Sequence, residues 1–323
     1  MAKRKKQKLK KWVYFALLGI IIIILGSYYG IKKYQEYRYQ QTLEYKIITH
    51  GYSKEEATTL QERLNEEQII SILDKEEHAT ILSLLQEKYF LFKNLDAYIE
   101  YIKEEEFDGK LSEVIAIINT HANNKWYTKE FTTNIQLKEQ MIVNKFYALD
   151  ESYKPENLKT ISLNYSYGKE GDNQLIDYAY EKFLELWNAA NEKGYYLMVT
   201  SSYRTYQEQA EIYNSRKSSQ GEKKADQTAA RPGHSEHQTG LVVDMTSKSE
   251  PYAEDFSQSK AYEWLKENAY KYGWIERYPE NKTYLTGYSP ESWHWRYVGT
   301  KAAKIIHDEE ITYDEYYAYY IEK

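Results

Sequence analysis

The sequence of 323 residues contains no cysteine and only five prolines. Without cysteine, the chain cannot form disulfides, use a thiolate nucleophile or bind zinc through thiolates. Acidic residues are also absent from the first 33 positions, which carry nine Lys and Arg residues, whereas the remaining chain has 34 basic and 49 acidic residues. Because phosphate contacts require clustered Lys and Arg, an acidic chain of this kind is not expected to bind nucleic acid.

An uncharged apolar run follows the basic N-terminus. Residues 12–31 read WVYFALLGIIIIILGSYYGI, and a helix of this length rises about 30 Å, which is enough to span the hydrocarbon core of a membrane. The positive-inside rule then places residues 1–11 in the cytoplasm and everything after Lys33 outside. We therefore expect a cytoplasmic tail at 1–11 and a single transmembrane anchor at 12–31. A cleaved signal peptide is the alternative, although no small-x-small cleavage site follows the run.

Residues 32–135 are predicted to form an extracytoplasmic helical region. Proline, which disrupts helix interiors, first occurs at Pro155. Ser53 and Glu56 have the spacing of a capping box, and apolar residues such as Leu60 and Leu64 follow at helical intervals. We interpret this region as a spacer between membrane and C-terminal domain, and a docking surface for protein partners is the alternative.

Residues 136–323 mix helical and strand patterns, which predicts an α+β domain with a small mixed antiparallel sheet and flanking helices. Short β-branched or alternating runs predict a strand ending near Val199 and strands in GLVVDMT (240–246) and SWHWRYV (292–298). Residues 215–233, SRKSSQGEKKADQTAARPG, are polar and charged, and we expect an exposed loop there.

Two histidines and one aspartate are candidate ligands of a catalytic zinc ion, which uses three protein ligands and keeps one position for water. His237 and Asp244 lie on either side of a turn in SEHQTGLVVD, and His294 lies on the strand predicted at 292–298. Glu291 precedes His294 by three residues and is placed to act as a general base. From these residues alone, buried histidines with structural hydrogen bonds remain the alternative.

His234 is a tempting further ligand because it precedes His237 by three residues. Ligands at this spacing converge on a helix, however, and Pro232, Gly233 and Gly240 favour a loop. The HExxH helix of many zinc peptidases is absent from the sequence. We therefore expect His234 to lie outside the ligand set, either behind it or at the surface.

The stretch SEHQTGLVVD resembles the S-x-H-x-x-G-x-x-x-D signature of zinc D-Ala-D-Ala carboxypeptidases and dipeptidases. The VanY-like branch, which includes bacterial L,D-carboxypeptidases of the LdcB/DacB type, is most similar. Further matching motifs occur in the family's order, and they are VNKFYALDESYKPENL (143–158), SSYRTYQEQ (201–209), ARPGHSEHQTG (230–240), GWIERYP (273–279) and TGYSPESWHWRYVG (286–299). The resemblance covers essentially all of residues 136–323.

The resemblance implies a role for seven residues. One Zn²⁺ per chain would be bound by His237, Asp244 and His294. Glu291 would be the catalytic base, and Arg204 would support the scissile carbonyl as it becomes an oxyanion. Ser235 and Gln209 match positions that line the substrate pocket.

The implied function is that of a zinc carboxypeptidase anchored in a bacterial cell membrane. It would remove the C-terminal D-alanine from peptidoglycan stem peptides, acting as a D,D-carboxypeptidase on pentapeptides. An L,D-carboxypeptidase acting on tetrapeptides is the alternative within the enzyme class. A non-catalytic cell-wall-binding or scaffold protein is the alternative from another class.

Overall fold

The computed structural model describes residues 10–322, which divide into two compact units between Phe92 and Lys93. Residues 1–9, the greater part of the expected cytoplasmic tail at 1–11, lie outside the described residues. Residues 93–135 belong to the same compact unit as the C-terminal sheet. The domain boundary at 135/136 stays a prediction.

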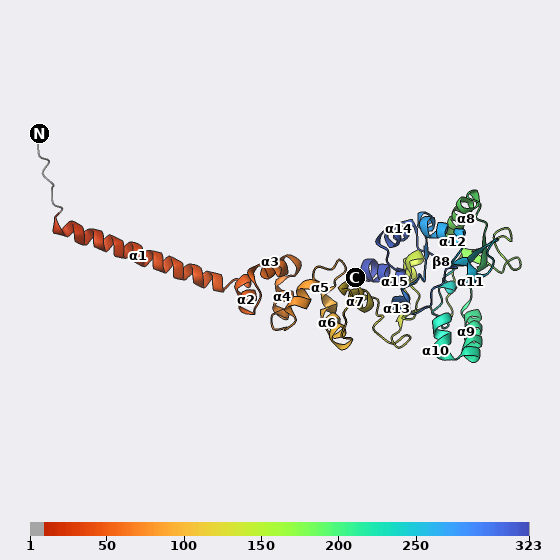
Figure 1. The fold of residues 1–323 in the computed structure, drawn as a ribbon, viewed down its shortest axis with the longest axis horizontal. Helices are drawn as coiled ribbons and strands as arrows, with labels where there is room; N and C mark the ends of the chain where they lie inside the picture. The colour runs from red at the N-terminus through yellow and green to blue at the C-terminus, as the bar shows by residue number, and fades with distance from the viewer. Residues whose placement is uncertain (1–9, 323) are drawn as a thin grey trace, which may run out of the picture. The chain divides into compact units, whose positions relative to one another are not determined.

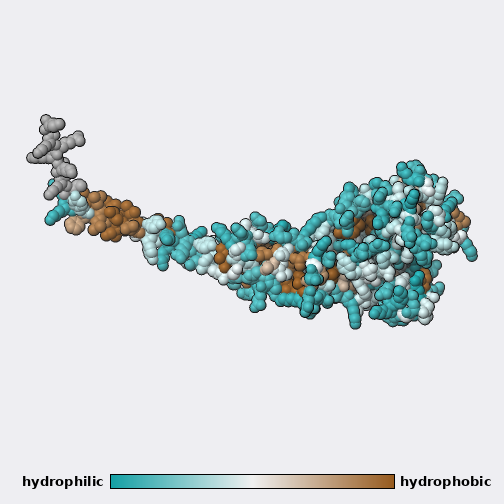
Figure 2. Space-filling model, in the orientation of Figure 1, coloured by the Kyte–Doolittle hydropathy of each residue, from teal (hydrophilic) through white to brown (hydrophobic). Residues whose placement is uncertain are grey.

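The first unit is helical in its described part. Its helices are α1 (Lys11–Gln40), α2 (Leu43–Thr49), α3 (Lys54–Arg63), α4 (Glu66–Ile72) and α5 (His78–Leu84). Helix α1 has 30 residues and buries none of them, and it is long and apolar enough to cross a membrane, a test that a signal sequence also passes. Its apolar side chains form the brown surface over the first part of this helix in Figure 2.

Local sequence explains why the short helices of this unit begin where they do. The predicted capping box is confirmed at α3, where the Glu56 N–H donates to Ser53 Oγ at 3.2 Å and the Ser53 N–H donates to Glu56 Oε2 at 2.7 Å. These bonds satisfy N–H groups that a helix start leaves unpaired. Behind the cap, Ala57 and Leu60 are fully buried, so the apolar stripe faces the small core of this unit.

The second unit contains the remaining elements. Its helices are α6 (Leu95–Glu104), α7 (Leu111–Asn119), α8 (Asp177–Glu192), α9 (Tyr206–Gln220), α10 (Glu222–Thr228), α11 (Ala253–Phe256), α12 (Lys260–Asn268), α13 (Thr283–Thr286), α14 (Thr300–Glu309) and α15 (Tyr313–Tyr316). Short 3₁₀ segments are η1 (Phe92–Asn94), at the unit boundary, η2 (Ile135–Gln140), η3 (Glu236–Thr239) and η4 (Ala269–Tyr272), and a π-helical turn is η5 (Tyr317–Ile321). The strands are β1 (Phe131–Thr132), β2 (Tyr147–Ala148), β3 (Leu158–Thr160), β4 (Gln174–Ile176), β5 (Leu197–Ser201), β6 (Val242–Ser247), β7 (Trp274–Glu276) and β8 (His294–Tyr297).

A four-stranded antiparallel sheet with the order β5-β6-β8-β7 forms the centre of the second unit. Two further two-stranded pairs accompany it, a parallel β1-β2 pair and an antiparallel β3-β4 pair. This arrangement confirms the predicted α+β class with a small sheet and flanking helices. Strand β7 was not predicted, because WIE is too short to show an alternating pattern.

The two faces of the central sheet have different chemistry. Successive side chains of a strand point to opposite faces. Val243 and Met245 of β6 and Trp295 of β8 belong to the main hydrophobic core, together with residues of α8 such as Phe183. The intervening Asp244 therefore points to the opposite face, and the cross-strand pair Asp244–His294 places His294 beside it.

The prediction of an exposed loop at residues 215–233 is wrong, because most of this stretch is helical. Helix α9 continues to Gln220 and α10 covers 222–228, and the two helices lie side by side in Figure 1. The only break is Gly221, which adopts φ +82°. Polar contacts hold the pair together, including a hydrogen bond from Tyr213 Oη to Asp226 Oδ1 at 2.7 Å. The polar composition reflects the exposure of these helices rather than a lack of secondary structure.

Candidate metal centre

The structure brings His237, Asp244 and His294 together. Each offers one ligand atom, and these atoms lie within 4.8 Å of one another. His237 lies in η3, Asp244 in β6 and His294 at the start of β8, directly across from Asp244 in the sheet. Cross-strand pairing in the antiparallel sheet therefore accounts for two of the three positions.

The two histidines present opposite ring nitrogens to Asp244. His237 Nε2 lies 3.4 Å from Asp244 Oδ1, and its Nδ1 lies 2.5 Å from the Ser202 carbonyl oxygen. Because a carbonyl oxygen only accepts, the proton of His237 is on Nδ1 and its Nε2 carries a lone pair. His294 instead presents Nδ1 to Asp244 Oδ1, at 3.3 Å, and has Glu236 Oε2 3.4 Å from its Nε2.

This donor set fits a metal ion. Asp244 Oδ1 is buried and has no hydrogen-bond partner among the described residues. Burial, with the charge of Arg204 adding to it, lowers the pKa of His237 to about 4, so its ring is neutral and able to bind a metal. A carboxylate oxygen that faces an imidazole lone pair is repelled unless a cation lies between them. Two imidazole nitrogens and one carboxylate, with a coordination position left open, are a typical catalytic zinc set.

Glu291 lies beside this group, in the turn that enters β8. Its Oε2 is 3.5 Å from His294 Nδ1. The backbone N–H of His294 donates to the backbone carbonyl oxygen of Glu291 at 3.1 Å, which fixes the turn. Burial raises the pKa of Glu291 to about 7. A carboxyl group with such a pKa exchanges a proton near neutral pH, as a general base and acid must.

Arg204 lies on the other side of Asp244. Its Nη1 donates to Gln209 Oε1 at 2.6 Å, and its Nη2 is 3.8 Å from Asp244 Oδ2. Gln209 is itself held by a bond from its Nε2 to the Ala230 carbonyl oxygen at 2.8 Å. The Nε of Arg204 is buried and has no partner among residues 10–322, so this N–H group is available to an oxygen atom of a bound molecule.

A cleft of about 420 Å³ opens onto this group. All seven residues predicted to form the site line it, namely Arg204, Gln209, Ser235, His237, Asp244, Glu291 and His294. They come from segments that are far apart in the sequence, and the fold places them around one cavity.

His234 lies outside the ligand group, as predicted, but it is buried rather than at the surface. Its Nδ1 donates to the Asn144 carbonyl oxygen at 2.7 Å, and its Nε2 lies 3.1 Å from Glu130 Oε2. Both ring nitrogens therefore have partners away from the cleft.

Three residues at the site were missed by the sequence reasoning. Tyr278 and Tyr288 line the cleft, and the ring centre of Tyr278 lies 4.9 Å from those of Tyr288 and His294. Among the 36 tyrosines, these two had a signal, because they lie in the motifs GWIERYP (273–279) and TGYSPESWHWRYVG (286–299). The third is Glu236. The sequence could have indicated it, because it is an acidic residue directly before the candidate ligand His237.

Comparison with known proteins identifies the relatives of this site. Residues 172–300 match the family model VanY: D-alanyl-D-alanine carboxypeptidase. YodJ of Bacillus subtilis strain 168 is 41% identical over 179 residues, which are 54% of this chain and 66% of YodJ. A solved structure of the LdcB LD-carboxypeptidase is 38% identical, with a TM-score of 0.56, over 59% of this chain and 90% of that one. A solved VanY D,D-pentapeptidase mutant in complex with Zn(II) is 32% identical, with a TM-score of 0.48, over 55% of this chain and 98% of that one.

The chain spans no more than about two thirds of three curated relatives, at 66%, 56% and 42% of their lengths. The LdcB chain, by contrast, is covered almost completely. The match to the family model includes His237, Asp244 and His294. The chain belongs to the VanY-like family of D-alanyl-D-alanine carboxypeptidases.

Proposed function

We propose that this chain is a zinc carboxypeptidase that releases the C-terminal D-alanine from peptidoglycan stem peptides. The observation that carries the proposal is the group of His237, Asp244 and His294 with the carboxylate of Glu291 beside it in one cleft. These parts match what hydrolysis of a peptide bond needs, which is a metal site with an open position and an adjacent base.

The roles of the chain's own residues follow from their positions. When bound, zinc supplies Lewis-acid chemistry that activates water and polarises a carbonyl group. Glu291 accepts a proton from the attacking water and later delivers it to the leaving amine, a cycle suited to its pKa of about 7. Arg204 donates from its unpartnered Nε–H to the carbonyl oxygen as negative charge develops there.

Gln209 and Ser235 contribute to the pocket that receives the substrate. Gln209 accepts a hydrogen bond from Arg204 and so keeps the guanidinium oriented toward the cleft. Ser235 is buried at the cleft wall, two residues before His237. Its hydroxyl group can both donate and accept, which suits a terminal carboxylate or amide.

The bond that is cut defines two versions of the proposal. D,D-cleavage of pentapeptides is the first and agrees with the description of the matching family model. L,D-cleavage of tetrapeptides is the second, and the 38% identity to LdcB over 90% of its chain favours it. A non-catalytic wall-binding or scaffold protein would need neither Glu291 nor a partner-free Arg204 N–H in the cleft.

Digestion of purified muropeptides tests the proposal. The full chain loaded with zinc is incubated with pentapeptide and tetrapeptide muropeptides, and mass spectrometry records which loses D-alanine. Glu291→Gln should lower release by about 10²–10⁴-fold while still binding about one zinc per chain. Glu280→Gln, at an exposed position outside the cleft, is the matched control and should leave release unchanged.

Two outcomes would reject the proposal. Undiminished release by Glu291→Gln would refute the role of that residue. Zinc binding without release from either muropeptide would favour the scaffold alternative.

We propose further that α1 is an uncleaved anchor with the rest of the chain outside the membrane and residues 32–135 acting as a spacer. The length and composition of α1 support an anchor. In cells, a protease added outside should degrade the C-terminal unit, and the mass of the purified N-terminal peptide should include residues 1–31. Protection of the C-terminal unit would contradict the orientation, and loss of these residues would favour a signal peptide.

A further inference from the structure

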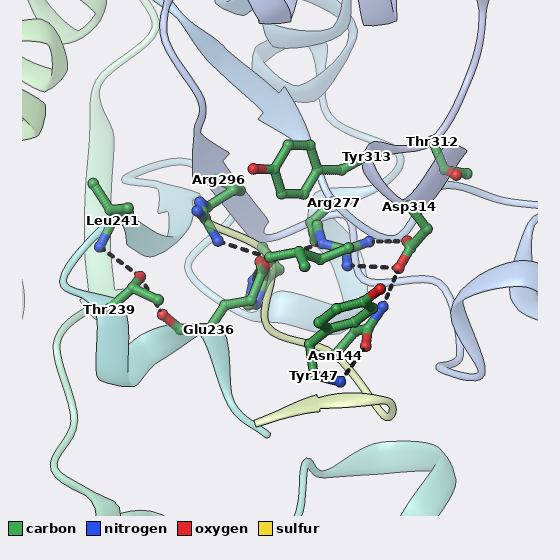
Figure 3. A network of polar contacts seen from close by, with 12 residues as sticks. Asn144, Tyr147, Glu236, Thr239, Leu241, Arg277, Arg296, Thr312, Tyr313 and Asp314 are labelled. Atoms are coloured by element: carbon green, nitrogen blue, oxygen red, sulfur yellow. Dashed lines mark hydrogen bonds and ion pairs between the residues drawn. The ribbon is translucent and has the colours of Figure 1, made fainter. Parts of the chain in front are cut away.

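The Glu236 side chain is completely buried behind the ligand group. Its Oε1 accepts hydrogen bonds from Arg277 Nε and Arg296 Nη1, both at 2.9 Å. Its Oε2 lies 3.4 Å from Nε2 of the candidate ligand His294. Figure 3 shows Glu236 between these two arginines. One carboxylate oxygen is therefore occupied by two guanidinium groups, and the other faces the histidine.

Further buried contacts fix the position of the two arginines. Arg277 donates to both oxygens of Asp314 in α15, at 2.6 and 3.2 Å, as Figure 3 shows. Arg296 donates from Nη2 to the Met141 carbonyl oxygen at 2.8 Å. The four side chains Glu236, Asp314, Arg277 and Arg296 form a neutral buried cluster, with two negative and two positive charges. Such a cluster leaves Glu236 little freedom to rotate.

This geometry determines where the proton of His294 lies once a metal ion is bound. A carboxylate oxygen only accepts hydrogen bonds. Two carboxylate oxygens, Asp244 Oδ1 and Glu291 Oε2, face Nδ1 in the same way, so Nδ1 is free of a proton only when a metal ion occupies its side. The ring proton is then on Nε2, where it donates to Glu236 Oε2. Nδ1 is the nitrogen that faces Asp244 Oδ1 at 3.3 Å.

We propose that Glu236 is a positioning residue that holds the proton of His294 on Nε2 and so keeps Nδ1 available to bind the metal. The inference rests on the metal site of the proposed function, and it concerns the assembly of that site rather than the reaction. Carboxylates that orient the ligand histidines of metal sites typically change metal affinity by about 10–100-fold when they are removed.

The substitution Glu236→Gln separates this role from a purely structural one. Guanidinium groups only donate hydrogen bonds, so Arg277 and Arg296 require the amide oxygen of the new glutamine. Its NH₂ group then faces His294 Nε2, which has to accept. The proton of His294 moves to Nδ1, where it blocks the nitrogen that would bind the metal. A side chain of nearly the same size thus reverses the proton position.

The test measures zinc affinity by chelator competition on the full chain, and the proton position of His294 by ¹⁵N NMR on the metal-free protein. Glu236→Gln should weaken zinc binding by about 10–100-fold and remove the proton from His294 Nε2, leaving one on Nδ1. Asp314→Asn is the matched control, because it disturbs the same cluster through Arg277 without contacting His294. The control should lower the free energy of unfolding but change zinc affinity less than threefold.

Several outcomes would overturn the inference. Equal losses of zinc affinity in the two variants would mean that the cluster is only structural, and an unchanged proton on Nε2 in Glu236→Gln would exclude the mechanism. If Glu236→Gln fails to fold, the double variant Glu236→Gln/Arg296→Met keeps the cluster neutral and still turns the amide toward His294, and the same criteria apply to it. Since neither readout uses substrate, a protein that binds zinc but releases no D-alanine would reject the proposed function alone.

Discussion

Substitution of Gly273 by alanine tests how closely the central sheet is packed at the end of β8 away from His294. Gly273 ends η4 at φ +85°, and its carbonyl oxygen accepts the Val298 N–H at 2.9 Å just beyond β8. A Cβ atom there would lie 2.7 Å from Tyr297 Cε2 and 3.0 Å from both Gly299 C and Thr300 N. Two of these neighbours are backbone atoms, so a rotamer change cannot relieve the contact.

Gly194 provides a matched control for the cost of placing an L-residue at positive φ. It follows α8 at φ +84°, almost the same value, and a Cβ atom there would have no neighbour within 4 Å. Both variants should lose about 1–2 kcal/mol because an L-residue is strained in the left-handed region. Gly273→Ala should lose about 1–3 kcal/mol more, since overpacking against atoms that cannot yield costs about this much.

Urea denaturation followed by tryptophan fluorescence measures the difference. Six of the seven tryptophans lie in residues 93–323, so the signal reports on the second unit. Gly273→Ala should have the lower midpoint at an unchanged slope. Equal midpoints for the two variants would refute the reasoning, because strain alone would then account for both losses.

Two further predictions concern a buried lysine and the metal. Burial lowers the pKa of Lys145 from 10.5 to about 7, so between these pH values the unfolded chain binds more protons and stability should rise with pH, by up to about 1.4 kcal/mol per pH unit. Lys145→Met should remove this rise in urea titrations, and equal slopes would contradict the explanation. Removing zinc with a chelator should lower the free energy of unfolding by about 3–4 kcal/mol if zinc had been present at 100–1,000 times its Kd, and an unchanged midpoint would argue against a zinc site in the folded chain.

The three candidate ligands, which the structure brings together, could be singled out because their signal is local. His237 and Asp244 lie in one short signature, and His294 lies in a second. The β-branched run of β6 and the alternating pattern of β8 also predicted that these segments are strands. Their pairing as neighbours, which places Asp244 across from His294, required the structure.

The surroundings of Glu236 could not be predicted from its neighbours in sequence. Its partners Arg277 and Arg296 are 41 and 60 residues away, and Asp314 lies beyond both. Charged residues are usually solvated, so a sequence gives no reason to expect four of them buried together. The helices at 206–228 were missed in part for a related reason, since exposed helices in this segment have a polar composition like that of a loop.

The position of the ligands in the sheet has a consequence for folding. Asp244 and His294 are cross-strand neighbours, so a metal ion bound to both links β6 to β8. A slip of one residue between strands would turn one ligand to the opposite face of the sheet. Only the native alignment then offers all three candidate ligands to the same ion. Zinc present during refolding should therefore stabilise the correctly paired sheet relative to slipped alternatives. This effect on strand register would occur before any substrate is bound.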